Sequence, residues 1–195
     1  MNVGTIDSLK DLIASNIQRL KSITQEVVLL SPINVQFAIT SAPIEKVKEY
    51  ITSDQEFDTE TESYLEVTLS ENSVYSSRLI KNKIEDIFIN FFDANKNTLG
   101  QYVDYSALLN KIYEIPGIER VRTVYDPGDP QEVIIRNGIS FASWSSTYID
   151  VGDDLEIGNS SKKLLEFQFP ELNTNDISSR IKVIRKSISN IVNVE

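Results

Sequence analysis

The chain has 195 residues, of which 41% are hydrophobic and 25% charged, a balance typical of globular proteins. It contains neither cysteine nor histidine, which excludes disulfides, thiolate chemistry, the commonest general base and the commonest zinc ligand. The net charge of −10 disfavours nucleic acids and anionic membranes, because both bind clustered lysine and arginine. No segment has the length and apolarity of a membrane span, and the first residues do not resemble a secretory signal. We therefore expect a soluble protein that is not secreted.

An amphipathic helix is predicted over residues 5–23. Its apolar residues fit a heptad template in which Asn16 takes the remaining inward position. A buried asparagine commonly fixes the register and number of packed helices, so this helix is a candidate for a helix–helix contact. The candidate contact residues are Ile6, Leu9, Ile13 and Leu20.

Two segments with alternating apolar residues are predicted to be strands that bury one face. They cover residues 33–40, INVQFAIT, and residues 63–70, SYLEVTLS. Between them, Pro43 is well placed to begin a short amphipathic helix that ends near residue 51. The acidic stretch DQEFDTETE that follows this helix is predicted to be a loop.

A long helix is predicted over residues 74–92, with Ser73 as its N-cap and a wide aromatic face that suits packing on a sheet. A polar turn ends at Gly100, and a short helix is expected over residues 105–113. Asn137-Gly138 is predicted to form a tight hairpin turn, because both residue types adopt positive φ at low cost. Further strands are predicted at 121–125, 132–136, 139–144, 147–151 and 164–172, with a loop at 152–163.

The last predicted element is a helix over residues 173–195, capped by Asp176. Its isoleucines recur in steps of four, three, four and three, a narrow stripe that suits a seam between helices. Packing on the chain's own domain usually takes a wider apolar face, but two heptads are few for a coiled coil, so both alternatives stay open. The stripe, a hypothetical protein-interaction surface, consists of Ile177, Ile181, Ile184, Ile188 and Ile191.

This order of elements predicts an α+β fold with small antiparallel or mixed sheets, packed helices, and an amphipathic helix at each end. We expect four parts: an N-terminal helix and linker over 1–31, an α+β domain over 32–126, a hairpin-rich region over 127–172, and a C-terminal helix over 173–195.

Acidic side chains are the only candidates for a reactive or metal site. The densest group contains Asp150, Asp153, Asp154 and Glu156, but its spacing lacks the alternating ligands and the distant glutamate of a calcium loop. A second group, in FDTETESYLE, is equally ambiguous, and phosphate-binding and nucleophile-elbow motifs are absent. Trp144 could stack on a ligand, although a single tryptophan among strands is more often core. We expect no catalytic, cofactor-binding or metal-binding residue.

One block, FFDANKNTLGQYVDYSALLNKIYEIPGIERVRTVY, resembles the carboxy-terminal region of the baseplate J and phage baseplate wedge families of contractile tails. It combines an aromatic helix end, a polar turn, Leu-Gly, a short helix and the pattern I-x-x-I-P-G-I-x-x-V. The strand YLEVTLS and the later NGISFASW also resemble the wedge subunit of T-even-type phages. The resemblance covers most of residues 33–172. Because members of these families are considerably longer, the chain is expected to be a fragment.

The resemblance implies a structural subunit without enzymatic activity, located in the virion tail baseplate and, during assembly, in the host cytoplasm. Its implied partners are itself, as a homodimer and in a ring around the tail tube, and other baseplate wedge proteins. No cofactor, nucleic acid or membrane is expected. The matching residues expected to carry the fold, not a contact, are Leu99, Gly100, Ile115, Pro116, Gly117 and Ile118. The glycines are expected to allow tight backbone geometry, and the aliphatic residues are expected to lie in the core.

Two alternatives to this function follow from the residues. A tail-associated glycan hydrolase would act through two carboxylates that converge in a cleft. A receptor- or glycan-binding module would expose Trp144 beside polar side chains.

Overall fold

The computed structural model describes residues 11–17, 31–52, 62–145, 156–158, 161–172 and 177–186. The chain divides into two compact units, Met1–Pro32 and Ile33–Glu195. In the first unit, residues 11–17 form a helix, which agrees with the prediction, and Ile13 on that helix is 40% exposed. The other contact residues predicted there, Ile6, Leu9 and Leu20, lie outside the described residues.

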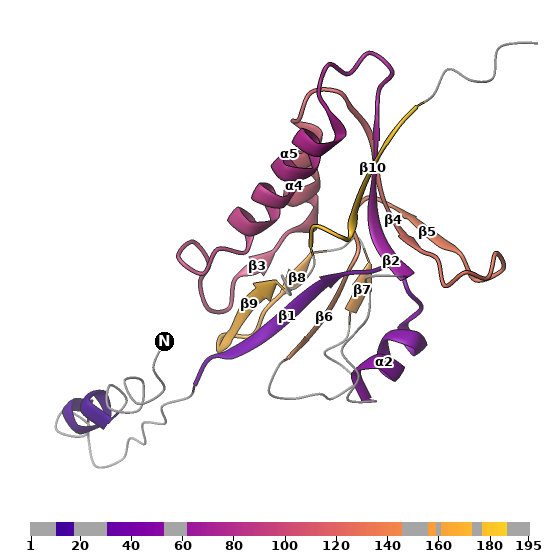
Figure 1. Ribbon diagram of the computed structural model, residues 1–195. Coiled ribbons are helices and arrows are strands. Elements are labelled where there is room, and N and C mark those ends of the chain that lie inside the picture. Colours follow the sequence, from indigo (N-terminus) through magenta and orange to yellow (C-terminus); the bar gives the residue numbers. More distant parts are fainter. Residues whose placement is uncertain are drawn as a thin grey trace, which may run out of the picture. The chain divides into compact units, whose positions relative to one another are not determined.

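The second unit has the predicted α+β fold (Figure 1). Its described strands form sheet A, in the order β7-β6-β1-β9, sheet B, in the order β10-β2-β4-β5, and a small sheet of β3 and β8. The helices are α2 (Ile44–Thr52), α4 (Ser77–Phe91) and α5 (Tyr105–Tyr113). The strands are β1 (Ile33–Ile39), β2 (Ser63–Leu69), β3 (Tyr102–Val103), β4 (Ile118–Tyr125), β5 (Ile134–Asn137), β6 (Phe141–Ser145), β7 (Glu156–Gly158), β8 (Lys162–Lys163), β9 (Gln168–Leu172) and β10 (Ile181–Arg185).

Strand β1 joins the two halves of the second unit, because both of its neighbours come from far along the chain. It pairs antiparallel with β6 and parallel with β9, so that Phe37 aligns with Ser143 on one side and Leu172 on the other. Strands from the predicted region 127–172 therefore share a sheet with the predicted domain 32–126, and both belong to the unit Ile33–Glu195.

In sheet B, β2 pairs antiparallel with β4 and parallel with β10, and β5 returns beside β4. The predicted tight hairpin at Asn137-Gly138 is wrong, since β5 pairs with β4 in sheet B whereas β6 pairs with β1 in sheet A. Gly138 does adopt a positive φ of 95°, but it carries the chain from one sheet to the other. The predicted loop 152–163 is also wrong in part, because it contains β7 and β8.

A cluster of aromatic rings packs between sheet A and the helices α4 and α5. The Phe141 ring of β6 lies with its centroid 4.9 Å from that of Tyr105 on α5, and 6.0 Å and 6.2 Å from those of Phe92 and Phe88. Phe37 of β1 packs against the same Phe141 at 6.2 Å. Tilted and edge-on ring pairs at these separations are favourable beyond the area they bury. The predicted aromatic face of the long helix is thus the core face of α4.

The start of α4 differs from the prediction. The helix begins at Ser77, and its N-cap is Ser76, whose side chain accepts a hydrogen bond from the backbone N–H of Leu79 at 3.2 Å. Ser73, the predicted cap, is instead a buried residue of the preceding loop. Its backbone N–H donates to the carbonyl oxygen of Ser70 at 3.1 Å, which closes a turn directly after β2.

The predicted C-terminal helix is wrong over residues 181–185, which form β10. β10 lies parallel to β2, with Ile181 aligned to Leu65 and Arg185 to Leu69. Its β-branched residues favour a strand, and pairing with β2 satisfies its backbone groups across a sheet, where a helix would satisfy them locally. The predicted cap Asp176 and the stripe residues Ile188 and Ile191 lie outside the described residues.

Two glycines of the family-like block have the structural role expected for them. Gly117 adopts a φ of 91°, and a Cβ on it would lie 2.6 Å from the Ser73 Oγ. Gly100 adopts a φ of 66°, and a Cβ there would lie 3.0 Å from the Glu166 Cα. Ile115 is buried as expected, whereas Leu99 is 49% exposed, so its predicted place in the core is wrong.

We predict that Gly117→Ala destabilises the protein more than Gly128→Ala. Gly128 has a similar φ of 88°, but no atom lies within 4 Å of its added Cβ, so this substitution costs only the backbone strain, about 1–2 kcal/mol. Gly117→Ala adds the clash with Ser73. Urea denaturation measures the free energy of unfolding of each variant. Adding Ser73→Gly and the double variant Gly117→Ala/Ser73→Gly completes a double-mutant cycle. Additive losses would show that the close approach to Ser73 does not matter.

Candidate protein-interaction surface

The two faces of sheet B differ in what covers them. Helices α4 and α5 pack against the face of sheet B that carries Leu65 and Val67 of β2 and Val121 of β4 (Figure 1). Successive side chains of a strand point to opposite faces, so the residues between these lie on the other side. We call that side the outer face. It consists of Tyr64, Glu66 and Thr68 of β2, Arg120, Arg122 and Val124 of β4, Ile135 and Asn137 of β5, and Lys182 and Ile184 of β10.

A half-buried ion pair forms the middle of the outer face. Glu66 and Arg122 are directly opposite each other on β2 and β4, and the Arg122 Nε donates to the Glu66 Oε1 at 2.6 Å. The two side chains are 11% and 22% exposed, respectively. This hydrogen bond to the Glu66 carboxylate raises the pKa of Arg122, although burial acts in the opposite direction. The pair therefore keeps a charged arginine on this face at every physiological pH.

On the other side of Glu66, β10 adds a second cation. Lys182 aligns with Glu66, and its Nζ lies 3.4 Å from the centroid of the Tyr64 ring, a cation–π contact. Burial raises the pKa of Tyr64, and the charge of Glu66 adds to this effect. Neutral Tyr64 thus presents its ring to the lysine near neutral pH. The row Lys182, Glu66 and Arg122 runs across three strands of sheet B.

The outer face is basic, although the chain as a whole is acidic. Among its ten residues are three cations, Arg120, Arg122 and Lys182, and one carboxylate, Glu66, on a chain with a net charge of −10. Further charges lie beside it, because Lys186 pairs with Glu119 at 2.9 Å and the charge of Asp126 acts on Tyr64. Aliphatic side chains are exposed towards both edges: Ile184 on β10 is 42% exposed, and Ile135 on β5 is 48% exposed. Exposed aliphatic groups beside arginine are typical of surfaces that bind proteins.

One polar group on the outer face is incompletely satisfied. Thr68 is 6% exposed, and within the described part of the chain its Oγ1 has no hydrogen-bond partner. It aligns with Ile184 on β10 and Arg120 on β4, beside a register shift between Thr68 and Leu69. A buried hydroxyl without a partner costs about 1–3 kcal/mol.

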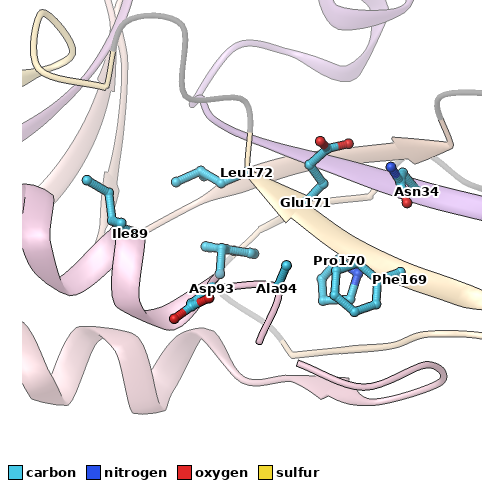
Figure 2. A pocket seen from close by; sticks show the side chains of 9 residues that line it. Asn34, Ile89, Asp93, Ala94, Phe169, Pro170, Glu171 and Leu172 are labelled. Carbon is cyan, nitrogen blue, oxygen red and sulfur yellow. The ribbon is translucent and has the colours of Figure 1, made fainter. Parts of the chain in front are cut away.

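A separate concave site lies beside sheet A. A pocket of about 410 Å³ is formed where the end of α4 approaches β9 (Figure 2). The pocket is lined by Asn34, Ile89, Phe92, Asp93, Ala94, Phe169, Pro170, Glu171 and Leu172.

The outward edge of β9 is protected against pairing with another strand. The backbone N–H of Ile33 donates to the carbonyl oxygen of Phe167 at 2.9 Å, and the parallel register then turns the backbone groups of Gln168, Pro170 and Leu172 away from β1. The Gln168 carbonyl oxygen accepts from the N–H of Gly100 at 3.0 Å, and proline has no N–H to donate. Prolines on edge strands commonly prevent strand addition. The pocket therefore does not suit an added β-strand.

The two carboxylates of the pocket do not fit the hydrolase alternative. A glycosidase needs one carboxyl group with a raised pKa as its general acid. In contrast, the backbone N–H of Asn95 donates to the Asp93 Oδ1 at 2.9 Å, which lowers the pKa of Asp93. Figure 2 also shows the carboxylates of Asp93 and Glu171 pointing in different directions. The pocket provides no converging acid pair.

The other predicted candidates are Trp144 and the densest acidic group. Trp144 is half-buried and packs against the small core of Ala42, Val47, Tyr125 and Ala142, which does not suit an open stacking platform. The side chains of the densest acidic group lie outside the described residues. Among the residues that are described, no three acidic, cysteine or histidine side chains could hold a metal ion, and no helix has the length and apolarity to cross a membrane.

The predicted isoleucine stripe is not one surface. Ile177 and Ile181 belong to the main hydrophobic core, whereas Ile184 lies on the outer face. Sequence reasoning missed the charged residues that accompany Ile184. Alternation in SYLEVTL and IKVIR places Glu66 and Lys182 opposite the core side chains of their strands, but it does not show that the two residues are neighbours.

We predict opposite outcomes for two isoleucines of β10. Ile181→Ala removes a 2% exposed side chain from the core and should lower the free energy of unfolding by about 2–5 kcal/mol. Ile184→Ala, on the exposed face of the same strand, should lower it by less than about 1 kcal/mol. Urea denaturation measures both. Equal losses at the two positions would contradict a strand with one buried face.

Comparison with known proteins identifies no family for this chain: no protein-family model matches it, and no curated protein does.

Proposed function

We propose that the chain is a structural subunit of a phage contractile-tail baseplate, which helps to assemble the wedge and inner ring through protein–protein contacts and has no enzymatic activity. The resemblance of residues 91–125 to baseplate proteins supports this proposal. These residues form one continuous piece of the fold, from the end of α4 through α5 to β4. Gly100 and Gly117 make the two tight backbone approaches within it.

The observation that carries the proposal is the outer face of sheet B. It combines exposed aliphatic side chains near both edges with arginine and lysine between them. Such a surface can bury apolar area against a partner while its charges select the partner and fix the register. An assembly subunit needs a surface of this kind, whereas a reaction centre needs groups with shifted pKa values that converge in a cleft.

The proposed location is the virion tail baseplate, with the host cytoplasm as the site of assembly. The proposed partners are other copies of the chain, as a homodimer and in a ring, and other baseplate wedge proteins. In a ring, the same contact recurs between every pair of neighbouring subunits. A modest affinity per contact therefore gives a stable assembly.

Immunogold electron microscopy of purified contractile-tail particles from the source that encodes this sequence tests the proposed function. We expect antibodies raised against the full chain to label the baseplate end of the tail. Antibodies first absorbed with the purified chain are the control and should give no label. Label absent from the particles, or confined to another part of the tail, would contradict the proposal.

A further inference from the structure

The loop between β4 and β5 is an acidic projection of the second unit. Residues 126–133, DPGDPQEV, contain Asp126, Asp129 and Glu132 and no cation, and all three acidic residues are exposed. Figure 1 shows the β4–β5 hairpin extending away from α4 and α5. Val133, at the base of the loop, adds an exposed aliphatic side chain. The projection thus offers carboxylates beside an apolar group.

The loop has a defined shape. The Asp126 Oδ1 accepts a hydrogen bond from the N–H of Gly128 at 3.1 Å, and the Asp129 Oδ1 accepts one from the N–H of Gln131 at 2.9 Å. Two prolines, Pro127 and Pro130, restrict the backbone further. A segment that is already ordered loses little conformational entropy when it binds.

The outer face has the complementary chemistry. Arg120 and Lys182 are exposed cations, and Ile184 is an exposed aliphatic group. Complementary charges steer two protein surfaces together and suppress other orientations. The chain therefore carries two groups of residues with complementary chemistry: exposed cations and an exposed aliphatic side chain on the outer face, and exposed carboxylates in the loop.

We propose that the outer face of sheet B binds the acidic loop, residues 126–133, of a second copy of this chain. This inference rests on the proposed function and names the contact through which one copy meets the next. Since the β4–β5 hairpin extends away from α4 and α5, each copy can offer its loop to one neighbour and receive the loop of another. Such a head-to-tail contact builds a ring when its rotation closes, which a self-complementary two-fold contact does not.

Light scattering on the full chain, with two sets of substitutions, tests this contact. The face variant is Arg120→Glu/Lys182→Glu, at exposed positions on β4 and β10. The loop variant is Asp126→Asn/Asp129→Asn/Glu132→Lys, in which the asparagine oxygens can still accept the two turn hydrogen bonds. The matched control is Arg78→Glu/Lys111→Glu, which makes the same charge change on α4 and α5.

We expect the unaltered chain to have a mass above the monomer's 22.1 kDa that rises with concentration and falls at high salt. The face variant and the loop variant should each be monomeric, and the control should behave like the unaltered chain. An equimolar mixture of the two variants should form a one-to-one dimer, because the intact loop of one fits the intact face of the other. Ile184→Asp provides a second face variant with the same expected loss.

A monomeric chain at every concentration would overturn this inference, as would variants that assemble like the unaltered chain. A mixture of the two variants that stays monomeric would overturn the pairing of face with loop. These failures are distinguishable from failure of the proposed function. If the chain is monomeric but antibodies against it still label the baseplate, the proposed structural role stands and only the contact between copies is overturned.

Discussion

The parallel pairing of β10 with β2 is the contact on which the rest of the structure depends. It places Ile181 in the core and Ile184 on the opposite side, and it brings Lys182 onto the Tyr64 ring beside Glu66. Without β10, β2 would be an edge strand, and the ion pair of Glu66 with Arg122 would lose its flanking lysine. One strand thus completes the inner core and forms the outer face.

On the outer face of this acidic protein, two cations, Lys182 and Arg122, flank the carboxylate of Glu66. A half-buried ion pair contributes little net stability, because desolvation offsets most of the attraction between its charges. Its better-supported role is to fix the register of neighbouring strands and to hold Arg122 in a defined position. The carboxylates of Asp129 and Glu132 lie in the β4–β5 loop, whereas Arg120, Arg122 and Lys182 lie on sheet B, so these charges of opposite sign are grouped in separate parts of the second unit.

Elements that depend on local signals could be predicted from the sequence. Strand β1, strand β2 and helix α5 agree with their predicted bounds to within one residue, because alternation and helical spacing follow directly from burial on one face. β10 could not be predicted, since Ile177, Ile181 and Ile184 match a helical repeat and only pairing with the distant β2 selects a strand. The outer face was missed for the same reason: no local pattern shows that Lys182, Glu66 and Arg122 lie side by side.

The most direct measurement of the central claim is site-specific disulfide cross-linking, which the absence of native cysteine makes unambiguous. A chain with Lys182→Cys is mixed with a chain with Glu132→Cys under mild oxidation, and the products are separated by mass. A disulfide forms only when the two Cβ atoms approach to about 3.5–4.5 Å. The account predicts that the mixed dimer linking positions 182 and 132 dominates. Equal amounts of mixed and like-with-like dimers, or no dimer at all, would contradict it.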